Sequence, residues 1–249
     1  FAVSQSGASP DIVAMAKGAR DGGATTISLV NTLPSPLADA ANHAVDIMAG
    51  PEIAVAATKS FVNSIVAGLA IIAAWTEDKD LERAVATLPK HLDKALALDW
   101  SALLQPLSTA ESLYMLGRGP ALAIAAEAAL KCKETCELHA EAYSSAEVLH
   151  GPVSIVGHDF PVVAFAARDK AEASIVQTVS KLSAGNAACF ITSDLGDGGH
   201  RLPFVATGHP ITDALALIVP YYGFIESLSR ARGFNPDKPV ALKKVTETQ

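Results

Sequence analysis

A strand–loop–helix–strand pattern occurs twice along the chain and limits the folds open to it. In the first copy, the apolar residues Phe1–Val3 and the β-branched stretch Thr25–Val30 flank a segment with helical periodicity. In the second copy, Phe160–Phe165 and Ala187–Thr192 flank the helix-like segment Ala171–Ala184. Two strands joined by a helix at this spacing predict a right-handed parallel βαβ unit. The pattern therefore predicts an α/β protein with parallel sheets.

Further elements are expected around these two units. The apolar residues Leu113–Leu116 predict a strand, followed by a helix that runs to about Leu138. The remaining expectations are a long buried helix at Glu52–Trp75, an amphipathic helix at Asp78–Leu98, a short strand at Pro203–Thr207, and a final helix at Thr212–Arg232 that bends if Pro220 lies inside it.

Composition excludes several classes of function. The 249 residues carry a formal net charge of −7, and no basic block is present to hold a nucleic acid. Three cysteines form no disulfide framework, so a reducing cytoplasm is expected. The longest uncharged apolar run, Ser60–Thr76, falls short of the roughly 20 residues that a membrane-spanning helix needs. We therefore expect neither a nucleic-acid partner nor a membrane.

A serine-rich loop follows the first predicted strand. Ser4-Gln5-Ser6-Gly7-Ala8-Ser9 leads into a helix with Ser9 as its expected N-cap and Pro10 at its first position. Open α/β sheets bind ligands at the carboxyl ends of their strands, and free N–H groups at a helix start favour phosphate. The alternative is a serine-rich turn that only caps the helix.

The equivalent loop of the second half contains Gly117-Arg118-Gly119. It is an incomplete dinucleotide fingerprint because Leu122 stands at the third glycine position, so a tight turn is the simpler interpretation.

Acid–base groups are densest between Lys131 and Pro152, where Glu134, His139, Glu147 and His150 lie close in sequence. Such groups suit proton transfer if they line a cleft, although many of them are also typical of a solvated surface. Cys132, Cys136 and His139 match no standard zinc spacing, so no metal is expected.

Four separated motifs together resemble one family. They are Ser4–Gly7, Ala49–Lys59, Leu116–Gly119, and His139–Tyr143 continuing through Glu147 to His150-Gly151-Pro152. In this order they resemble the tandem sugar isomerase (SIS) family, in particular its glucosamine-6-phosphate synthase and stand-alone deaminase members. The resemblance runs from Phe1 to the lysine-rich end of the chain.

The resemblance implies two doubly wound, flavodoxin-like parallel-sheet SIS domains, the first of them lacking its N-terminal part in this chain. It places the rest of the first domain at residues 1–76, a helical connector at 77–106, the second domain at 107–232 and an active-site tail at 233–249. Phe1 lies inside a predicted core strand, which is why we expect further sequence upstream of it.

Site residues are also implied by the resemblance alone. Glu134 matches the base that moves a proton between C1 and C2, and Lys131 matches its helper. His150 matches the ring-opening residue, which in the family acts across the subunits of a homodimer, and Lys244 matches a lysine over the substrate. The matches for sugar-phosphate binding are Ser4, Gln5, Ser6, Ser9, Val55 and Ala57. No cofactor is implied.

Three functions follow as hypotheses. The first is a stand-alone enzyme that interconverts glucosamine 6-phosphate and fructose 6-phosphate with ammonia. The second is the isomerase module of a glutamine-dependent aminotransferase, and the third is a sugar-phosphate sensor without catalysis.

Overall fold

The computed structural model describes residues 1–242 and residue 244, and it divides into two compact units. Unit 1 comprises Phe1–Glu82 together with the segment from Asp237 on, and unit 2 comprises Arg83–Pro236. The predicted boundaries after residues 76, 106 and 232 stay predictions. Residues 243 and 245–249, part of the predicted tail, lie outside the described residues.

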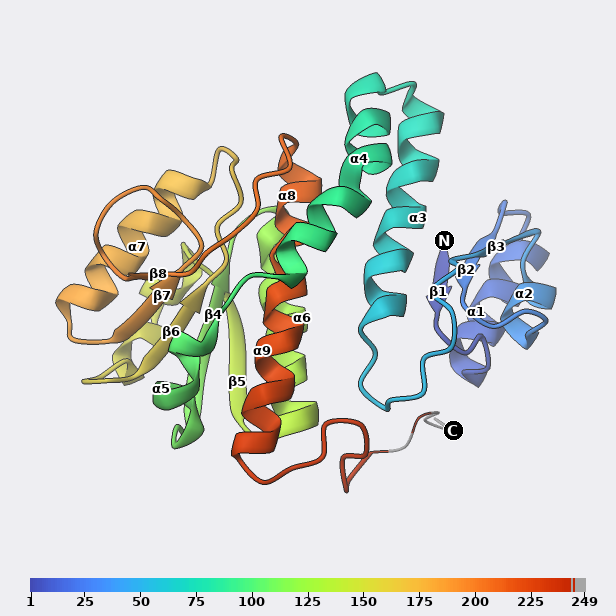
Figure 1. The fold of residues 1–249 in the computed structure, drawn as a ribbon. Coiled ribbons are helices and arrows are strands. Elements are labelled where there is room, and N and C mark those ends of the chain that lie inside the picture. The colour runs from blue at the N-terminus through green and yellow to red at the C-terminus, as the bar shows by residue number, and fades with distance from the viewer. Residues whose placement is uncertain (243, 245–249) are drawn as a thin grey trace. The chain divides into compact units, whose positions relative to one another are not determined.

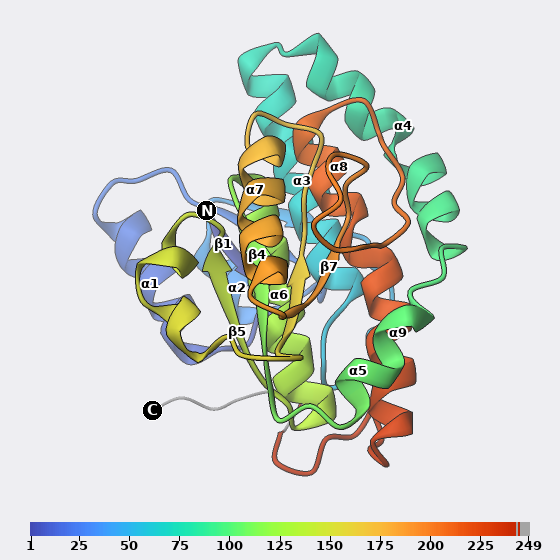
Figure 2. The same ribbon diagram turned by 90° about the vertical axis from the view of Figure 1, so that its left-hand side faces the viewer.

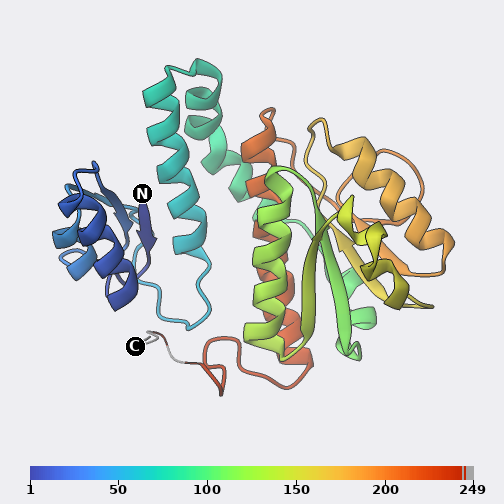
Figure 3. The ribbon, with the colours of Figure 1, turned by 180° about the vertical axis from the view of Figure 1, so that it is seen from behind.

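Unit 1 contains a three-stranded parallel sheet in the order β1-β2-β3. Its elements are β1 (Ala2–Ser4), α1 (Pro10–Asp21), β2 (Ile27–Val30), α2 (Pro36–Ala40), β3 (His43–Asp46) and α3 (Lys59–Thr76). Helices α1 and α2 bury Ala16, Val30 and Leu37 on one face of the sheet, and α3 lies on the other face (Figures 1 and 3). The predicted parallel βαβ unit is confirmed.

The first long helix differs from the prediction in its start and its burial. It begins at Lys59 rather than Glu52, because the Glu52 carboxylate accepts hydrogen bonds from the backbone N–H groups of Lys59 (2.8 Å) and Ser60 (3.3 Å). Glu52 therefore caps the helix from outside it. The helix was expected to be buried all round, yet Ile72 is 44% exposed and Trp75 is 77% exposed.

Unit 2 contains a five-stranded parallel sheet in the order β5-β4-β6-β7-β8. Helix α4 (Lys79–Leu96) crosses the boundary between the units. The other elements are η1 (Ser101–Leu103), α5 (Leu104–Ser108), β4 (Ser112–Gly117), α6 (Pro120–Cys136), β5 (His139–Ser144), η2 (Glu147–His150), η3 (Pro152–Ile155), β6 (Pro161–Ala164), α7 (Glu172–Ala184), β7 (Ala188–Ile191), β8 (His200–Arg201), α8 (Pro210–Ala216) and α9 (Ile218–Ala231).

Both faces of this sheet are covered. Alternate residues such as Tyr114, Leu116 and Val162 pack against α7 and against the short helices η2 and η3. Helices α6 and α9 lie on the opposite face (Figures 2 and 3). There Phe165 and Tyr221 place their rings 5.8 Å apart. An α/β fold with parallel sheets is thus confirmed, while the doubly wound arrangement stays a prediction.

Three local features of unit 2 differ from the sequence-based expectations. The last strand is His200–Arg201, and the strand predicted at Pro203–Thr207 is absent there, because Pro203 has no N–H to continue the ladder. The final helix is divided at Leu217, where the missing N–H of Pro220 removes a hydrogen bond to the preceding turn. Strand β5 was not predicted.

Two helical segments, Lys59–Thr76 and Pro210–Ala231, are long and apolar enough to cross a membrane by length and composition alone. The second segment is mostly buried, and core helices meet the same criteria, so the two helices are weak evidence for a membrane span.

Candidate active site

The serine-rich loop of unit 1 connects β1 to α1, and its backbone N–H groups form hydrogen bonds with its own serine side chains. The N–H of Gly7 donates to Ser4 Oγ (3.1 Å) and the N–H of Ala8 donates to Ser6 Oγ (3.3 Å). Ser9 stands at the N-cap position as predicted, but its side chain makes no capping hydrogen bond within the described helix. Its hydroxyl is therefore available for a ligand at the start of a twelve-residue helix.

Gly7 fixes the shape of this loop. Its φ of +64° lies in the region that favours glycine, and a Cβ there would lie 2.3 Å from Ser35 Oγ. The Gly7 carbonyl accepts from Leu37 N (2.9 Å), and the Gln5 carbonyl accepts from Asn31 N (3.3 Å). The loop is thus anchored by its backbone to the residue after β2 and to α2.

A second segment of unit 1 contains the predicted residues Val55 and Ala57 and contacts the predicted Lys244. The N–H of Val55 donates to the Asp237 carbonyl (3.3 Å), and the Lys244 ammonium donates to the Ala54 carbonyl. Asp237 and Lys244 thus contact the segment that contains Val55, and Lys244 adds a cation there.

Glu52 lies just before Val55 and Ala57 in the sequence, and its side chain forms hydrogen bonds with the start of α3. Burial acts to raise the pKa of this carboxyl, but hydrogen bonds from Ser60, Thr58 and Lys59 outweigh it, so the pKa lies below its ordinary value. Glu52 is thus a fixed anion and an N-terminal cap for α3.

Two of the predicted acid–base residues of unit 2, Lys131 and Glu134, meet near the end of α6. Lys131 Nζ donates to Glu134 Oε2 at 2.6 Å and lies 3.2 Å from Glu127 Oε1. These residues meet because positions three and four apart share one face of a helix. Lys131 is only 3% exposed, so its charge must be matched by carboxylates rather than by water.

Glu127 was not predicted as a site residue. It is 7% exposed, and the hydroxyl of Tyr222 on α9 donates to its Oε1 at 2.8 Å. Burial raises the pKa of Glu127, although Lys131 and Tyr222 oppose this by stabilising the anion. The spacing Glu127–Lys131–Glu134 on an otherwise apolar helix was the signal available in the sequence.

His150 lies apart from this cluster in its local structure. It ends the short helix η2 and is exposed. Its expected action across a dimer stays a prediction.

The cysteines flanking the cluster are buried in the core. Burial raises the pKa of Cys132 to about 12, and the thiol lies 3.1 Å from the Tyr221 hydroxyl. Among the described residues, no group of three or more metal-ligating side chains gathers.

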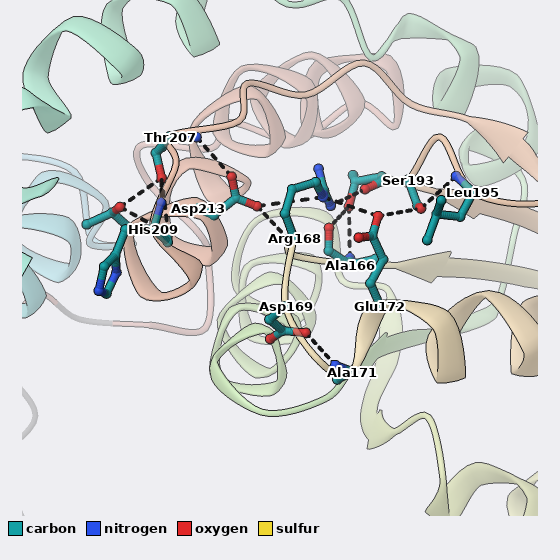
Figure 4. Close-up of polar contacts among 12 residues, drawn as sticks. Ala166, Arg168, Asp169, Ala171, Glu172, Ser193, Leu195, Thr207, His209 and Asp213 are labelled. Atoms are coloured by element: carbon teal, nitrogen blue, oxygen red, sulfur yellow. Dashed lines mark hydrogen bonds and ion pairs between the residues drawn. The ribbon is translucent and has the colours of Figure 1, made fainter. Parts of the chain in front are cut away.

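The loop that follows β6 carries Arg168, whose side chain is surrounded by charged and polar groups of the same protein (Figure 4). The Arg168 guanidinium donates to the Thr192 carbonyl (2.6 Å) and forms ion pairs with Glu172 (3.2 Å) and Asp213 (3.8 Å). It also lies 3.8 Å above the ring of Phe204. Two carboxylates thus surround one guanidinium, which removes any net positive charge that would attract an anion.

The family to which these features correspond is identified by direct comparison. The model of the SIS domain matches residues 1–74 and 106–197. This chain belongs to the SIS domain family. The chain is also 30% identical, over 262 aligned residues, to the glutamine--fructose-6-phosphate aminotransferase (isomerizing) of Sulfolobus acidocaldarius. That match covers 100% of this chain and 42% of the relative, so the chain spans less than half of that relative's length.

Solved structures show the same fold. A candidate phosphosugar isomerase from Silicibacter pomeroyi DSS-3 has a TM-score of 0.90 and 50% identity, covering 94% of this chain and 72% of that one. A glucosamine-6-phosphate deaminase from Thermotoga maritima has a TM-score of 0.82 at 20% identity, covering 100% and 75%. The likeness to the deaminase concerns the fold alone.

Proposed function

We propose that this SIS protein interconverts an aldose 6-phosphate and a ketose 6-phosphate by moving a proton between C1 and C2. The observation that carries the proposal is the carboxylate of Glu134, held 2.6 Å from the buried ammonium of Lys131. A proton shift between neighbouring carbons needs one carboxylate that both removes and returns the proton, and a nearby cation stabilises the enediolate oxygen.

Each predicted residue then has a chemical task. Glu134 transfers the proton, Lys131 supports it, and His150 opens the sugar ring. The Ser4–Ser9 loop binds the phosphate, whose remote binding energy positions the reacting carbons. Lys244, beside the Val55–Ala57 segment of unit 1, contributes a cation for the sugar.

The preferred substrate pair is glucosamine 6-phosphate and fructose 6-phosphate: after the proton shift, water adds at C2 and the C2–N bond breaks, which releases ammonia. The test is incubation of the purified protein with glucosamine 6-phosphate, measuring ammonia and fructose 6-phosphate. Glu134→Gln is expected to lower kcat by about 10³-fold, in the range of lost general acid–base catalysis. Glu137→Gln is the matched control, because Glu137 is an exposed carboxylate one turn further along. Absence of turnover by the wild type, or full activity of Glu134→Gln, would contradict the proposal.

A second candidate is the isomerase module of a glutamine-dependent aminotransferase. It is favoured by the aminotransferase relative that matches over the whole chain. Formation of glucosamine 6-phosphate from fructose 6-phosphate and glutamine by the full-length protein would favour this candidate over the deaminase. Binding of both sugar phosphates without turnover would favour a sensor instead. A homodimer and a cytoplasmic location belong to the same proposal.

A further inference from the structure

Two neighbouring tyrosines of α9 contact two neighbouring residues of α6, in different ways. The Tyr221 hydroxyl donates to the backbone carbonyl of Ala128 at 2.8 Å, and Tyr221 is fully buried. The Tyr222 hydroxyl donates to the side-chain carboxylate of Glu127, also at 2.8 Å. The Tyr221 hydroxyl thus contacts a backbone carbonyl and the buried thiol of Cys132, whereas the Tyr222 hydroxyl contacts a carboxylate.

Glu127 is the first link of a continuous polar chain. The oxygen that accepts from Tyr222 is the same Oε1 that lies 3.2 Å from Lys131 Nζ. Lys131 Nζ in turn lies 2.6 Å from Glu134 Oε2. Three contacts therefore connect a hydroxyl on α9 to the proposed base on α6, all of them inside unit 2.

The charge on Glu127 decides how Lys131 is shared. The charged or titratable groups that act on Glu127 are Lys131 and Glu134 on its own helix and Tyr221 and Tyr222 on α9. An ionised Glu127 attracts the ammonium away from Glu134, whereas a protonated Glu127 leaves the ammonium to Glu134. A carboxylate bound that tightly to an ammonium is a weaker proton acceptor. A hydrogen bond that favours ionised Glu127 thus favours a reactive Glu134.

We propose that Tyr222 is a positioning residue of this cluster, which holds the carboxylate of Glu127 and, through Glu127 and Lys131, sets the placement of Glu134. The inference rests on the proposed function, because Glu134 acts as a base only in that reaction.

The kinetic test compares Tyr222→Phe with Tyr221→Phe, which removes the same atom from the neighbouring residue. Tyr222→Phe is expected to lower kcat by about tenfold, with KM nearly unchanged. It should also move the acidic limb of the kcat–pH profile upward by about one pH unit, because Glu127 loses a hydrogen bond that favours its anion. Tyr221→Phe is expected to lower the unfolding midpoint while leaving the pH profile in place. Kinetics of Tyr222→Phe identical to those of the wild type would overturn the proposal.

A double variant tests whether Tyr222 acts through Glu127. Glu127→Gln removes the charge that Tyr222 holds, so adding Tyr222→Phe to it is expected to change kcat by less than about twofold. If Tyr222→Phe lowers the activity of Glu127→Gln tenfold, as in the wild type, the two residues act independently and the proposal is wrong.

An NMR titration separates this inference from the proposed function. With ¹³C at the glutamate carboxyl carbons, the titration midpoint of Glu127 is expected to rise by about one pH unit in Tyr222→Phe. This measurement needs no turnover. If the wild type turns over no sugar phosphate but the midpoint rises, the proposed function fails and the action of Tyr222 on Glu127 stands. If the midpoint does not move, the inference fails whatever the activity.

Discussion

The loops that follow β1 in unit 1 and β6 in unit 2 begin corresponding βαβ units, but they satisfy their polar groups differently. The first loop, Ser4–Ser9, forms hydrogen bonds between its own residues and leaves the Ser9 hydroxyl without a capping role in the described helix. The second carries Arg168, which Glu172 and Asp213 neutralise from neighbouring helices. One fold element thus serves as a candidate anion site in one unit and carries an internal charge network in the other.

The difference teaches that a loop's place in the fold does not decide its role. Both loops lie at the carboxyl end of a parallel strand and lead into a helix. What separates them is the source of the compensating charge. The serine loop has polar side chains that an external anion would satisfy, whereas the charge of Arg168 is matched inside the protein by Glu172, four residues along, and by the distant Asp213.

The largest expected effect comes from breaking the charge network around Arg168. Asp213 is 1% exposed and accepts from the backbone N–H groups of Arg168 (2.8 Å) and Thr207 (3.0 Å). Asp213→Ala is expected to lower the free energy of unfolding by about 3 kcal/mol, because it removes one of the two carboxylates beside Arg168 and leaves the backbone N–H groups of Arg168 and Thr207 without their acceptor. Urea denaturation measures the change. Asp169→Ala is the control, because Asp169 lies in the same loop but is only half-buried. Equal losses in both variants would show that Asp213 is not essential to the network.

An intermediate effect, on ligand binding, is expected when two hydroxyls are removed from the serine loop. The double variant Ser6→Ala/Ser9→Ala should weaken fructose 6-phosphate binding by about tenfold or more, measured by calorimetry. Its free energy of unfolding should change by less than about 0.5 kcal/mol, because these side chains are not buried.

Thr192→Val provides the opposite case in unit 2. Thr192 Oγ1 accepts from Ala166 N at 2.9 Å and is buried, so its loss should cost about 1 kcal/mol of stability and leave phosphate binding unchanged. If Thr192→Val weakened phosphate binding and Ser6→Ala/Ser9→Ala instead lowered stability, the two loops would not differ in this way.

The smallest effect concerns Glu52, the carboxylate that caps α3 in unit 1. Because its pKa is lowered in the folded protein, it stabilises the fold above the ordinary glutamate pKa and loses that contribution as the pH falls through the lowered value. Glu52→Gln is expected to cost about 1 kcal/mol at pH 7. The difference from the wild type should disappear in acid.

Glu77→Gln changes an exposed carboxylate at the other end of α3 and serves as the control. A pH-independent loss in Glu52→Gln would mean that the side chain acts by packing rather than by its charge.

Local sequence pattern was sufficient for the elements that hold the site. The start of α1 at Pro10 and the strands β1, β2, β6 and β7 follow from apolar runs, proline position and periodicity within a few residues. The cluster of Lys131 and Glu134 was also accessible, since residues three apart on a helix must share a face.

Predictions failed where a distant or unusual partner decided the outcome. Glu52 is a good helix residue, yet its carboxylate is used to cap the helix that follows, so the helix begins at Lys59. The apolar residues Pro203–Thr207 match a strand by composition, but a proline at the start ends the ladder after Arg201.

The sequence by itself determined the parallel α/β class, the two βαβ units and the family motifs, because these depend on neighbours a few residues apart. Only the tertiary structure decided which charges are matched internally and which remain for a ligand. Glu127 and Tyr222 lie 95 positions apart and Arg168 and Asp213 lie 45 apart, and no local pattern predicts that either pair meets. The physical reason is that burial removes water as a partner, so the role of a polar side chain is set by whichever group folding places beside it.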